Sequence, residues 1–266
     1  MPSFDLSGRA AIVTGGSQGL GRAMAIALAG AGADVAVVAR EPESVTRGKS
    51  RPHEPVTTVT QEIEKTGRRA LGITADVRDR GQVAGMVDQV HKAFGRIDVL
   101  VNVVGGSWGE TFRAGPLLEI GEQDVMEAYR VNVVTMFLCS TAVLPLMKQQ
   151  GRGSIINIAS VAGRGPSPGQ GSYGAAKAAV INMSQTMAIE WAPEVRVNAI
   201  AVGGVETPHR PRWVDLDQRE NPAADLPAVG RLGTPEEHAG TVVWLASDAA
   251  SYITGIVIDA HGGRRR

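Results

Sequence analysis

The chain contains one cysteine, Cys139, among its 266 residues. A lone cysteine cannot form an internal disulfide, and its apolar context (FLCSTAV) favours a buried, inert thiol over a nucleophile. The five histidines show no spacing typical of metal ligands, so we expect neither a structural nor a catalytic metal. The fold must therefore rest on its hydrophobic core, for which a hydrophobic content of 43% is sufficient.

An excess of either charge is also missing. The chain carries 27 Lys and Arg against 27 Asp and Glu, which argues against a general nucleic-acid or membrane-surface binder. No long uninterrupted apolar segment stands out, and the first ten residues, MPSFDLSGRA, lack the basic and apolar regions of a secretory signal. We expect a cytoplasmic protein that binds neither nucleic acid nor membrane.

Short apolar runs alternate with segments of helical character along the whole chain. The runs are continuous rather than alternating, which is typical of strands covered on both faces, as in a parallel sheet. The predicted strands are 10–14, 34–39, 70–75, 99–104, 154–159 and 196–201, and the predicted helices are 22–31, 57–66, 81–94, 122–149 and 172–191. The pattern predicts an α/β fold: one Rossmann-type domain over residues 1–266, with a doubly wound parallel sheet of about seven strands and helices on both faces.

A glycine-rich turn, GGSQGLG at 15–21, joins the first strand to the first helix. Gly15, Gly19 and Gly21 permit a tight turn, close approach of the backbone to a pyrophosphate, and close packing of helix on strand. A glycine-rich turn without a ligand is the competing interpretation. The second strand ends at Ala39 and is followed by Arg40, where an arginine would accommodate the 2′-phosphate of NADP(H). Glu41 and the neutral Gln18 weaken this preference, so NADP(H) is favoured over NAD(H) without excluding it.

A hydroxyl, a phenol and an ammonium follow the strand at 154–159. Ser160 stands at its end, and Tyr173 and Lys177 lie one turn apart on one face of the next helix. A nearby ammonium would lower the pKa of the phenol, so Tyr173 could donate and accept protons, while Ser160 could orient a substrate oxygen. By itself this pattern is short and arises easily by chance.

These elements together resemble the short-chain dehydrogenase/reductase family, and in particular its 3-oxoacyl-carrier-protein reductase-like members. The resemblance covers nearly the whole chain and is carried by TGGSQGLG at 14–21, DV at 76–77, NVVG at 102–105, Asn132, Ser160 with Tyr173 and Lys177, and the closing run at 231–255.

The resemblance implies a hydride transfer between a nicotinamide and a carbinol or carbonyl carbon, with Tyr173 as general acid/base. It implies that Lys177 also holds the nicotinamide ribose and that Asn132 holds a proton-relay water, although a core amide bonded to backbone is the alternative for Asn132. The implied cofactor-binding residues are Gly15, Ser17, Gln18, Gly19, Leu20, Gly21, Arg40, Asp76, Val77, Asn102, Val103, Gly105, Tyr173, Lys177, Gly203, Val205 and Thr207.

Two positions depart from the family pattern. Asn102, Val103, Val104 and Gly105 stand where the family usually reads N-N-A-G, and Val202 precedes Gly203 where a proline is usual. Both changes affect the geometry of the cofactor site rather than a proton-transfer group.

Two polar segments lack an apolar period: an extended loop at 41–56 and a segment at 208–228 that resembles the family's substrate lid. Candidate substrate contacts follow the strand ends or lie in the second segment, and they are Ser107, Trp108, Arg164, Gln170, His209 and Trp213. The resemblance also suggests a homotetramer, with the helices at 122–149 and 172–191 packing against a partner.

The sequence thus predicts an oxidoreductase that transfers a hydride between a nicotinamide cofactor, NADP(H) before NAD(H), and a small-molecule secondary alcohol or ketone such as a 3-oxoacyl or polyketide-like carbonyl. An NAD-dependent alcohol dehydrogenase for sugar-like or steroid-like substrates remains an alternative. So do a non-catalytic nucleotide-binding member of the family and a structural partner subunit.

Overall fold

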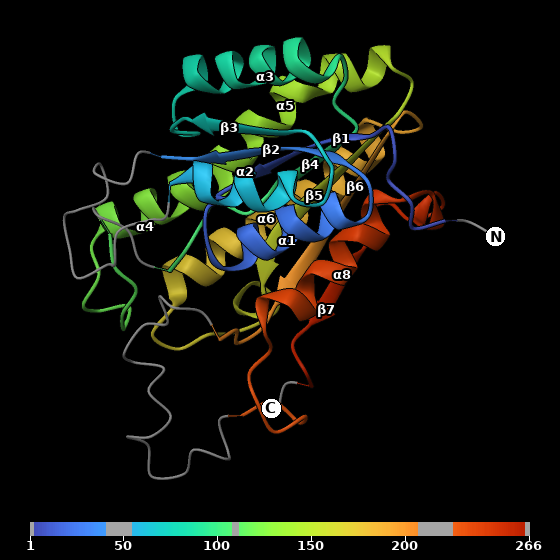
Figure 1. The fold of residues 1–266 in the computed structure, drawn as a ribbon. Coiled ribbons are helices and arrows are strands. Elements are labelled where there is room, and N and C mark those ends of the chain that lie inside the picture. Colours follow the sequence, from blue (N-terminus) through green and yellow to red (C-terminus); the bar gives the residue numbers. More distant parts are fainter. Residues whose placement is uncertain (1–2, 41–54, 108–111, 207–225, 264–266) are drawn as a thin grey trace.

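The computed structural model describes residues 3–40, 55–107, 112–206 and 226–263. Seven parallel strands form one sheet in the order β3-β2-β1-β4-β5-β6-β7 (Figure 1). The strands are β1 (Ala10–Thr14), β2 (Asp34–Ala39), β3 (Ala70–Thr74), β4 (Val99–Asn102), β5 (Gly153–Ser160), β6 (Val195–Val202) and β7 (Val257–Ala260). Their order confirms the predicted doubly wound parallel sheet, whose winding reverses between β1 and β4.

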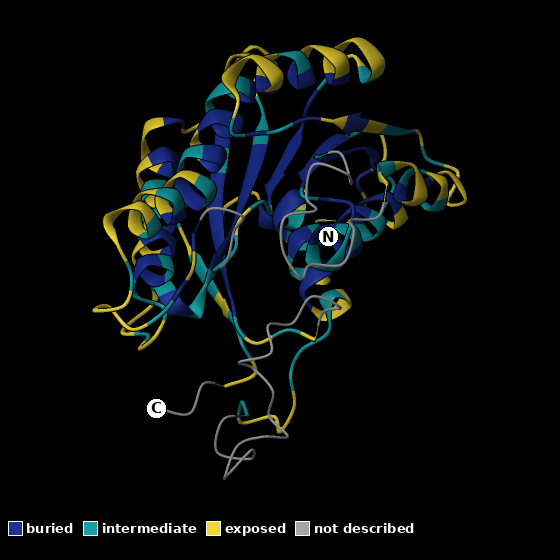
Figure 2. Cartoon of the chain, turned by 90° about the vertical axis from the view of Figure 1, so that its left-hand side faces the viewer, coloured by how far each residue is buried: buried dark blue, intermediate teal, exposed yellow. Residues whose placement is uncertain are grey.

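Helices cover both faces of the sheet. They are α1 (Gly19–Gly30), α2 (Val56–Glu64), α3 (Arg80–Phe94), α4 (Glu122–Tyr129), α5 (Thr135–Gln149), α6 (Gly171–Glu190) and α8 (Pro235–Ala246). The side chains of α3, α5 and α6 share one core cluster with the sheet, and those of α1, α2 and α8 share the other. Figure 2 shows the strands as the most completely buried layer, between helices whose outer sides are exposed.

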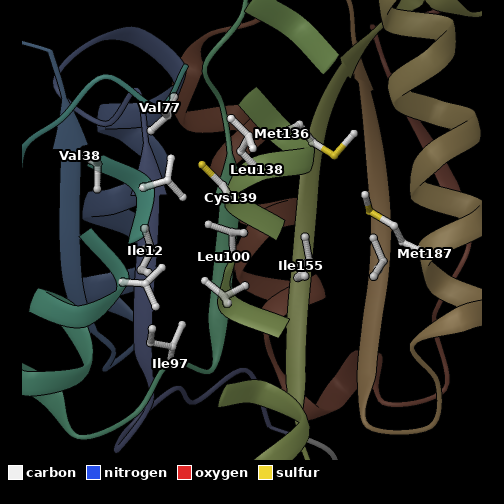
Figure 3. Packing of buried hydrophobic residues seen from close by; sticks show 14 of the residues in the cluster. Ile12, Val38, Val77, Ile97, Leu100, Met136, Leu138, Cys139, Ile155 and Met187 are labelled. Atoms are coloured by element: carbon white, nitrogen blue, oxygen red, sulfur yellow. The ribbon is translucent and has the colours of Figure 1, made fainter. Parts of the chain in front are cut away.

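The core explains why the strands are apolar on both faces. β1 and β2 are buried along their whole length. Ile12, Leu100 and Ile155 come from three adjacent strands and belong to one core cluster with Cys139 and Met187, on the face that α5 and α6 cover (Figure 3). Cys139 is fully buried, and burial raises the pKa of its thiol to about 12. The prediction of a buried, inert thiol is confirmed.

The boundaries of several elements differ from the sequence prediction. α1 begins at Gly19 rather than residue 22, so the last glycines of the turn form its first turn. β4 ends at Asn102 rather than residue 104, because the Val103 amide leaves the ladder and donates to Thr14 Oγ1. α2 begins at Val56, the last residue of the expected 41–56 loop; residues 41–54 lie outside the described chain.

The predicted long helix at 122–149 is interrupted. Residues Arg130–Val134 form one π-helical turn between α4 and α5, and Asn132 lies in it. This stretch is also the one helix among the described residues that is long and apolar enough to cross a membrane, with a mean hydropathy of 1.5. Half of its most apolar window is buried in the protein, as in a core helix, so the expectation of no long apolar segment was too strict.

Candidate active site

The turn between β1 and α1 can be built only from glycine at three positions. Gly15 and Gly19 have φ values of +67° and +51°, which disfavour other residues. A Cβ on Gly21 would lie 2.1 Å from the carbonyl oxygen of Gly15, inside contact distance. The turn therefore has the close helix-to-strand packing that the sequence predicts, and Ser17 is buried within it.

The N-terminus of α1 points its amides at this turn without a capping side chain. Gln18 occupies the N-cap position and makes no capping bond, and the first turn holds no acidic residue. Asp79 caps α3 and Thr234 caps α8, whereas α2 and α6 lack a side-chain cap as α1 does. An uncapped helix N-terminus behind a glycine cradle is a site for an anion. These residues fit the pyrophosphate of a dinucleotide, with Leu20 in the first turn of the helix.

Charged side chains gather where the adenosine end of a dinucleotide would lie, after β2 and β3. Arg78 donates from Nε to both carboxylate oxygens of Asp76, at 2.9 Å each. Burial opposes ionisation of Asp76, but the hydrogen bonds from Arg78 and the charges of Arg78 and Arg40 hold its pKa below the ordinary value. Arg40 thus lies close enough to Asp76 to influence it. Val77, the next residue, is buried.

Asn102 turns its side chain into the core rather than toward the glycine turn. Its Nδ2 donates to Ser140 Oγ at 3.0 Å and to Asn157 Oδ1 at 2.8 Å. A contact between this residue and a cofactor would therefore have to come from its backbone. Val103, which follows, is partly buried against the α1 side of the core.

Gly105 lies against two of the predicted catalytic residues. A Cβ at this position would be 2.5 Å from Asn132 Oδ1 and 3.0 Å from Lys177 Nζ. Asn132 accepts from the Gly106 amide at 3.0 Å and donates to the carbonyl oxygens of Gly106 and Ala128 at 2.9 Å each. These bonds are those of a backbone-bonded amide and fasten the loop after β4 to the π turn; the proton-relay role of Asn132 stays a prediction.

Ser160, Tyr173 and Lys177 come together at the carboxyl end of β5. Ser160 ends the strand and accepts from the Ala162 amide at 3.2 Å, and its side chain is close enough to Tyr173 to act on the pKa of the phenol. Tyr173 is half-buried in the first turn of α6. Lys177 is 4% exposed; its Nζ lies 5.8 Å from the Tyr173 ring centroid and donates to the Ile158 carbonyl oxygen at 2.8 Å.

Burial dominates the acid–base properties of this group. It raises the pKa of Tyr173, and the hydrogen bond from Ser160 only partly opposes it. It lowers the pKa of Lys177 to about 8. The prediction that the pKa of Tyr173 is lowered is wrong for the chain without a ligand, because burial of the phenol outweighs the effects that favour its ionised form.

The remaining predicted residues divide into three groups. Gly203 and Val205 follow β6: the Gly203 amide donates to Ala260 at 3.0 Å, and Val205 bridges to Gly233. Ser107 and Gln170 are partly buried after β4 and before α6. Thr207, Trp108, His209 and Trp213 lie outside the described residues, as does most of the 208–228 segment.

Arg164 is exposed and ion-paired. Its Nε donates to Asp259 Oδ1 at 3.0 Å, so its charge is already matched within the chain. This pair weakens the candidacy of Arg164 as a contact for an anionic substrate.

Sequence reasoning missed the Ile158 carbonyl as the acceptor for Lys177, since a main-chain group leaves no mark in the sequence. It also missed Asn157, Ser140 and Ser184, although an asparagine within an apolar strand is a visible signal. Across the described ranges, no group of three or more His, Cys, Asp or Glu could hold a metal ion.

Comparisons with known proteins agree with this geometry. Residues 15–265 match the family model described as enoyl-(acyl carrier protein) reductase. The chain is 36% identical to the 3-oxoacyl-[acyl-carrier-protein] reductase FabG of Thermotoga maritima over 97% of its length and 98% of that protein. It is 40% identical to the short-chain reductase NovJ of Streptomyces niveus over 96% of its length and 93% of that protein.

Among solved structures, a 7α-hydroxysteroid dehydrogenase complexed with NADH and a 7-oxo bile acid superposes with a TM-score of 0.84. It shares 28% identity, and the alignment covers 98% of this chain and 95% of that one. The glycine turn, the uncapped helix and the Ser160, Tyr173 and Lys177 group occur here in a chain matched over nearly its whole length. The chain belongs to the short-chain dehydrogenase/reductase family and is an oxidoreductase that acts on CH-OH or carbonyl groups.

Proposed function

We propose that this chain is an NADP(H)-preferring carbonyl reductase or alcohol dehydrogenase for a small-molecule secondary alcohol or ketone. The observation that carries the proposal is the placement of three groups together: Ser160 at the end of β5, Tyr173 in the first turn of α6, and the buried Lys177 with its Nζ 5.8 Å from the Tyr173 ring centroid. Three groups able to orient a carbonyl oxygen and move a proton stand at the strand edge that also holds the glycine turn. A protein that only sensed a nucleotide would need the turn but not these groups.

In the proposed reaction the bound nicotinamide supplies or accepts the hydride. Ser160 donates a hydrogen bond to the substrate oxygen and holds it within reach of Tyr173. In the reductive direction the Tyr173 phenol gives its proton to that oxygen, and in the oxidative direction the phenolate takes it. Burial raises the pKa of Tyr173, and the charge of Lys177 beside the ring would offset this cost as the proton leaves the phenol.

Lys177 stabilises the phenolate that forms. Its ammonium is held beside the ring by the Ile158 carbonyl oxygen, and its lowered pKa allows it to exchange a proton near neutral pH. We propose that Asn132 acts through position: its three backbone hydrogen bonds hold Gly105 and Gly106 against Lys177. This assigns Ser160, Tyr173 and Lys177 to the chemistry and Asn132 to their support.

The NADP(H) preference rests on Arg40 and its neighbours. Arg40 and Arg78 both act on Asp76, so these three described residues carry two positive charges and one negative charge. A net positive charge there favours a 2′-phosphate over a free hydroxyl. The NADH in the related hydroxysteroid dehydrogenase structure supports the alternative, an NAD-dependent alcohol dehydrogenase.

For the substrate we propose a 3-oxoacyl or polyketide-like carbonyl, on the strength of the similarity to the 3-oxoacyl-[acyl-carrier-protein] reductase of Thermotoga maritima. We further propose one domain over residues 1–266 that is cytoplasmic and binds neither nucleic acid nor membrane. Its lid would be the 208–228 segment.

A homotetramer is proposed from an exposed apolar face. Val125, Met126 and Tyr129 on α4 and Phe137 on α5 are between 38% and 60% exposed. Large apolar side chains grouped in this way on one helical stretch mark a surface that a partner covers. A second copy of the chain is the partner we propose.

The test is a titration of the purified chain with NADPH and NADH, followed by nicotinamide fluorescence, and then a panel of carbonyl substrates with the preferred cofactor. We expect NADPH to bind at least tenfold more tightly and 3-oxoacyl thioesters to be reduced. Arg40→Ala should remove most of the difference in affinity between NADPH and NADH. Equal binding, or tighter binding of NADH, would reverse the cofactor assignment, and no binding of either would favour a structural subunit.

A further inference from the structure

Four buried polar side chains form a chain of hydrogen bonds across the core. Ser140 of α5 accepts from Asn102 of β4; Asn102 also donates to Asn157 of β5; and Asn157 Nδ2 donates to Ser184 Oγ of α6 at 2.8 Å. We refer to them as the polar chain. Each member is at most 5% exposed. The polar chain thus runs from one helix through two strands to the helix that carries Tyr173 and Lys177.

The polar chain lies where stability alone would favour apolar side chains. Asn157 lies between Ile155 and Ala159 on the face of β5 that the α5 and α6 side chains cover, and both neighbours belong to the apolar core. A buried amide must be fully hydrogen-bonded to be tolerated, whereas apolar residues of similar volume need no partner. Apolar packing is also non-directional, whereas a hydrogen bond fixes one alignment of two elements.

α6 is therefore attached to β5 by polar contacts at two levels. Near the reaction centre, Lys177 Nζ donates to the carbonyl oxygen of Ile158. At the neighbouring residue of β5, Asn157 donates to Ser184, whose own hydroxyl donates to the Val180 carbonyl at 2.6 Å. Ser184 lies seven residues beyond Lys177, or roughly 10 Å along the helix, although their partners are adjacent on β5. Two attachment points well separated on α6 resist both sliding and tilting of the helix.

The alignment matters because the catalytic groups are divided between the same two elements. Ser160 ends β5, three residues or about 10 Å beyond Asn157, and its partner Tyr173 begins α6. A shift of α6 along β5 would change the distance between Ser160 and Tyr173 directly. A displacement of about 1 Å in such a group can lower a rate by a factor of about 100.

We infer that Ser184 is a positioning residue for the reaction: its bond to Asn157 sets the alignment of the catalytic helix on β5. The inference rests on the proposed function for its kinetic readout. Among the described residues, Ser184 hydrogen-bonds Asn157 and Val180 and not Tyr173 or Lys177, so it would act only through the helix. Ser140, at the other end of the polar chain, is on a helix without a predicted proton-transfer group and serves as the control.

The test compares Ser184→Thr with Ser184→Val, which have nearly the same shape and differ by the hydroxyl. With Ser184→Thr we expect kcat within about threefold of the unchanged chain. With Ser184→Val we expect kcat to fall at least tenfold and its pH profile to shift, while the dissociation constant for the cofactor changes less than threefold. Ser140→Ala should lower the melting temperature and leave kcat unchanged.

Equal kcat values for Ser184→Thr and Ser184→Val would overturn the inference, as would a loss of kcat in Ser140→Ala as large as in Ser184→Val. If Ser184→Val does not fold, Ser184→Ala replaces it in the same comparison. If the unchanged chain shows no turnover, the proposed function fails independently of this inference. Amide hydrogen exchange then tests the inference about Ser184. Faster exchange at 171–180 in the variant without the hydroxyl supports the inference, and exchange equal to that of Ser140→Ala contradicts it.

Discussion

At the scale of single residues, the buried Lys177 is the most consequential side chain in the site. Its ammonium has one hydrogen-bond acceptor, the Ile158 carbonyl, and little contact with water. Burial without a carboxylate partner explains why its pKa falls from 10.5 to about 8. The fold thus holds a poorly solvated ammonium close to Tyr173, where a proton-transfer reaction needs a positive charge.

The lowered pKa of Lys177 predicts how the free energy of unfolding depends on pH. Between pH 8 and 10.5 the unfolded chain still holds the Lys177 proton while the folded chain has released it, so the free energy of unfolding rises with pH through this window. Replacing Lys177 with Met removes the contribution. Relative to Lys177→Met, the unchanged chain should gain about 3 kcal/mol between pH 8 and 10.5, measured by urea unfolding at each pH. A constant difference across the window would contradict a depressed pKa.

Residue by residue, the sequence revealed side chains but not their partners. Ser160, Tyr173 and Lys177 were predictable because strand, turn and helical spacing bring them together. The direction of the Tyr173 pKa shift was not, because it depends on how far the fold buries the phenol. The inward turn of Asn102 depends likewise on Ser140 and Asn157, which are distant in sequence.

At the scale of elements, the glycine turn and α1 act as one unit. A helix whose N-terminus is uncapped must find another partner for its first amides. The turn can approach an anion closely only because Gly15, Gly19 and Gly21 lack side chains. α1 also packs on α8, so the position of the turn is fixed by the core on that face of the sheet.

Two glycine-to-alanine substitutions distinguish the effect of close packing in the glycine turn from the effect of helix propensity. In Gly21→Ala the new Cβ would lie 2.1 Å from the Gly15 carbonyl oxygen. We expect the free energy of unfolding to fall by about 1–3 kcal/mol and the cofactor affinity to fall at least tenfold.

Gly85 in α3 is the matched control, because a Cβ there meets open space. Gly85→Ala should raise the free energy of unfolding by about 0.5–1 kcal/mol with cofactor binding unchanged. Denaturant titration and fluorescence titration measure both quantities. If Gly21→Ala changed neither the free energy of unfolding nor the cofactor affinity, the close contact between Gly21 and Gly15 would not be needed.

Elements differ in how well the sequence predicted them. β1 and β2 match the predicted ranges, because their burial depends only on their own apolar residues. The π turn at Arg130–Val134 escaped prediction, since apolar periodicity continues through it. The reason for the turn lies outside the helix, in the hydrogen bonds between Asn132 and Gly106.

At the scale of the whole molecule, the sheet brings every described site segment to one edge. The glycine turn follows β1, Arg40 follows β2, Asp76 follows β3, Gly105 follows β4 and Ser160 ends β5. The parallel order places the carboxyl ends of all these strands together, with the reversal of winding between β1 and β4. Strand order, which the sequence implied through alternating strands and helices, therefore determines the location of the site.

The exposed apolar face of α4 and α5 leads to a prediction about assembly. If a second copy covers Phe137, which is 38% exposed, then Phe137→Asp should reduce the assembled species because a buried carboxylate opposes association. Phe4→Asp is the control, since Phe4 is 56% exposed and lies far from α5 in sequence. Sedimentation velocity should show a smaller particle for Phe137→Asp only. Equal sizes for both variants would place the interface elsewhere.

The most direct test of the account is single-turnover hydride transfer in Tyr173→Phe. The phenylalanine ring retains the packing of Tyr173 and removes only the hydroxyl that Ser160 contacts and that would move the proton. With the preferred cofactor and a reducible ketone, we predict a fall of at least about 100-fold in the rate of carbonyl reduction and a change of less than threefold in cofactor affinity. Turnover retained at the unchanged rate would contradict the role of Tyr173 and, with it, the proton-transfer centre proposed here.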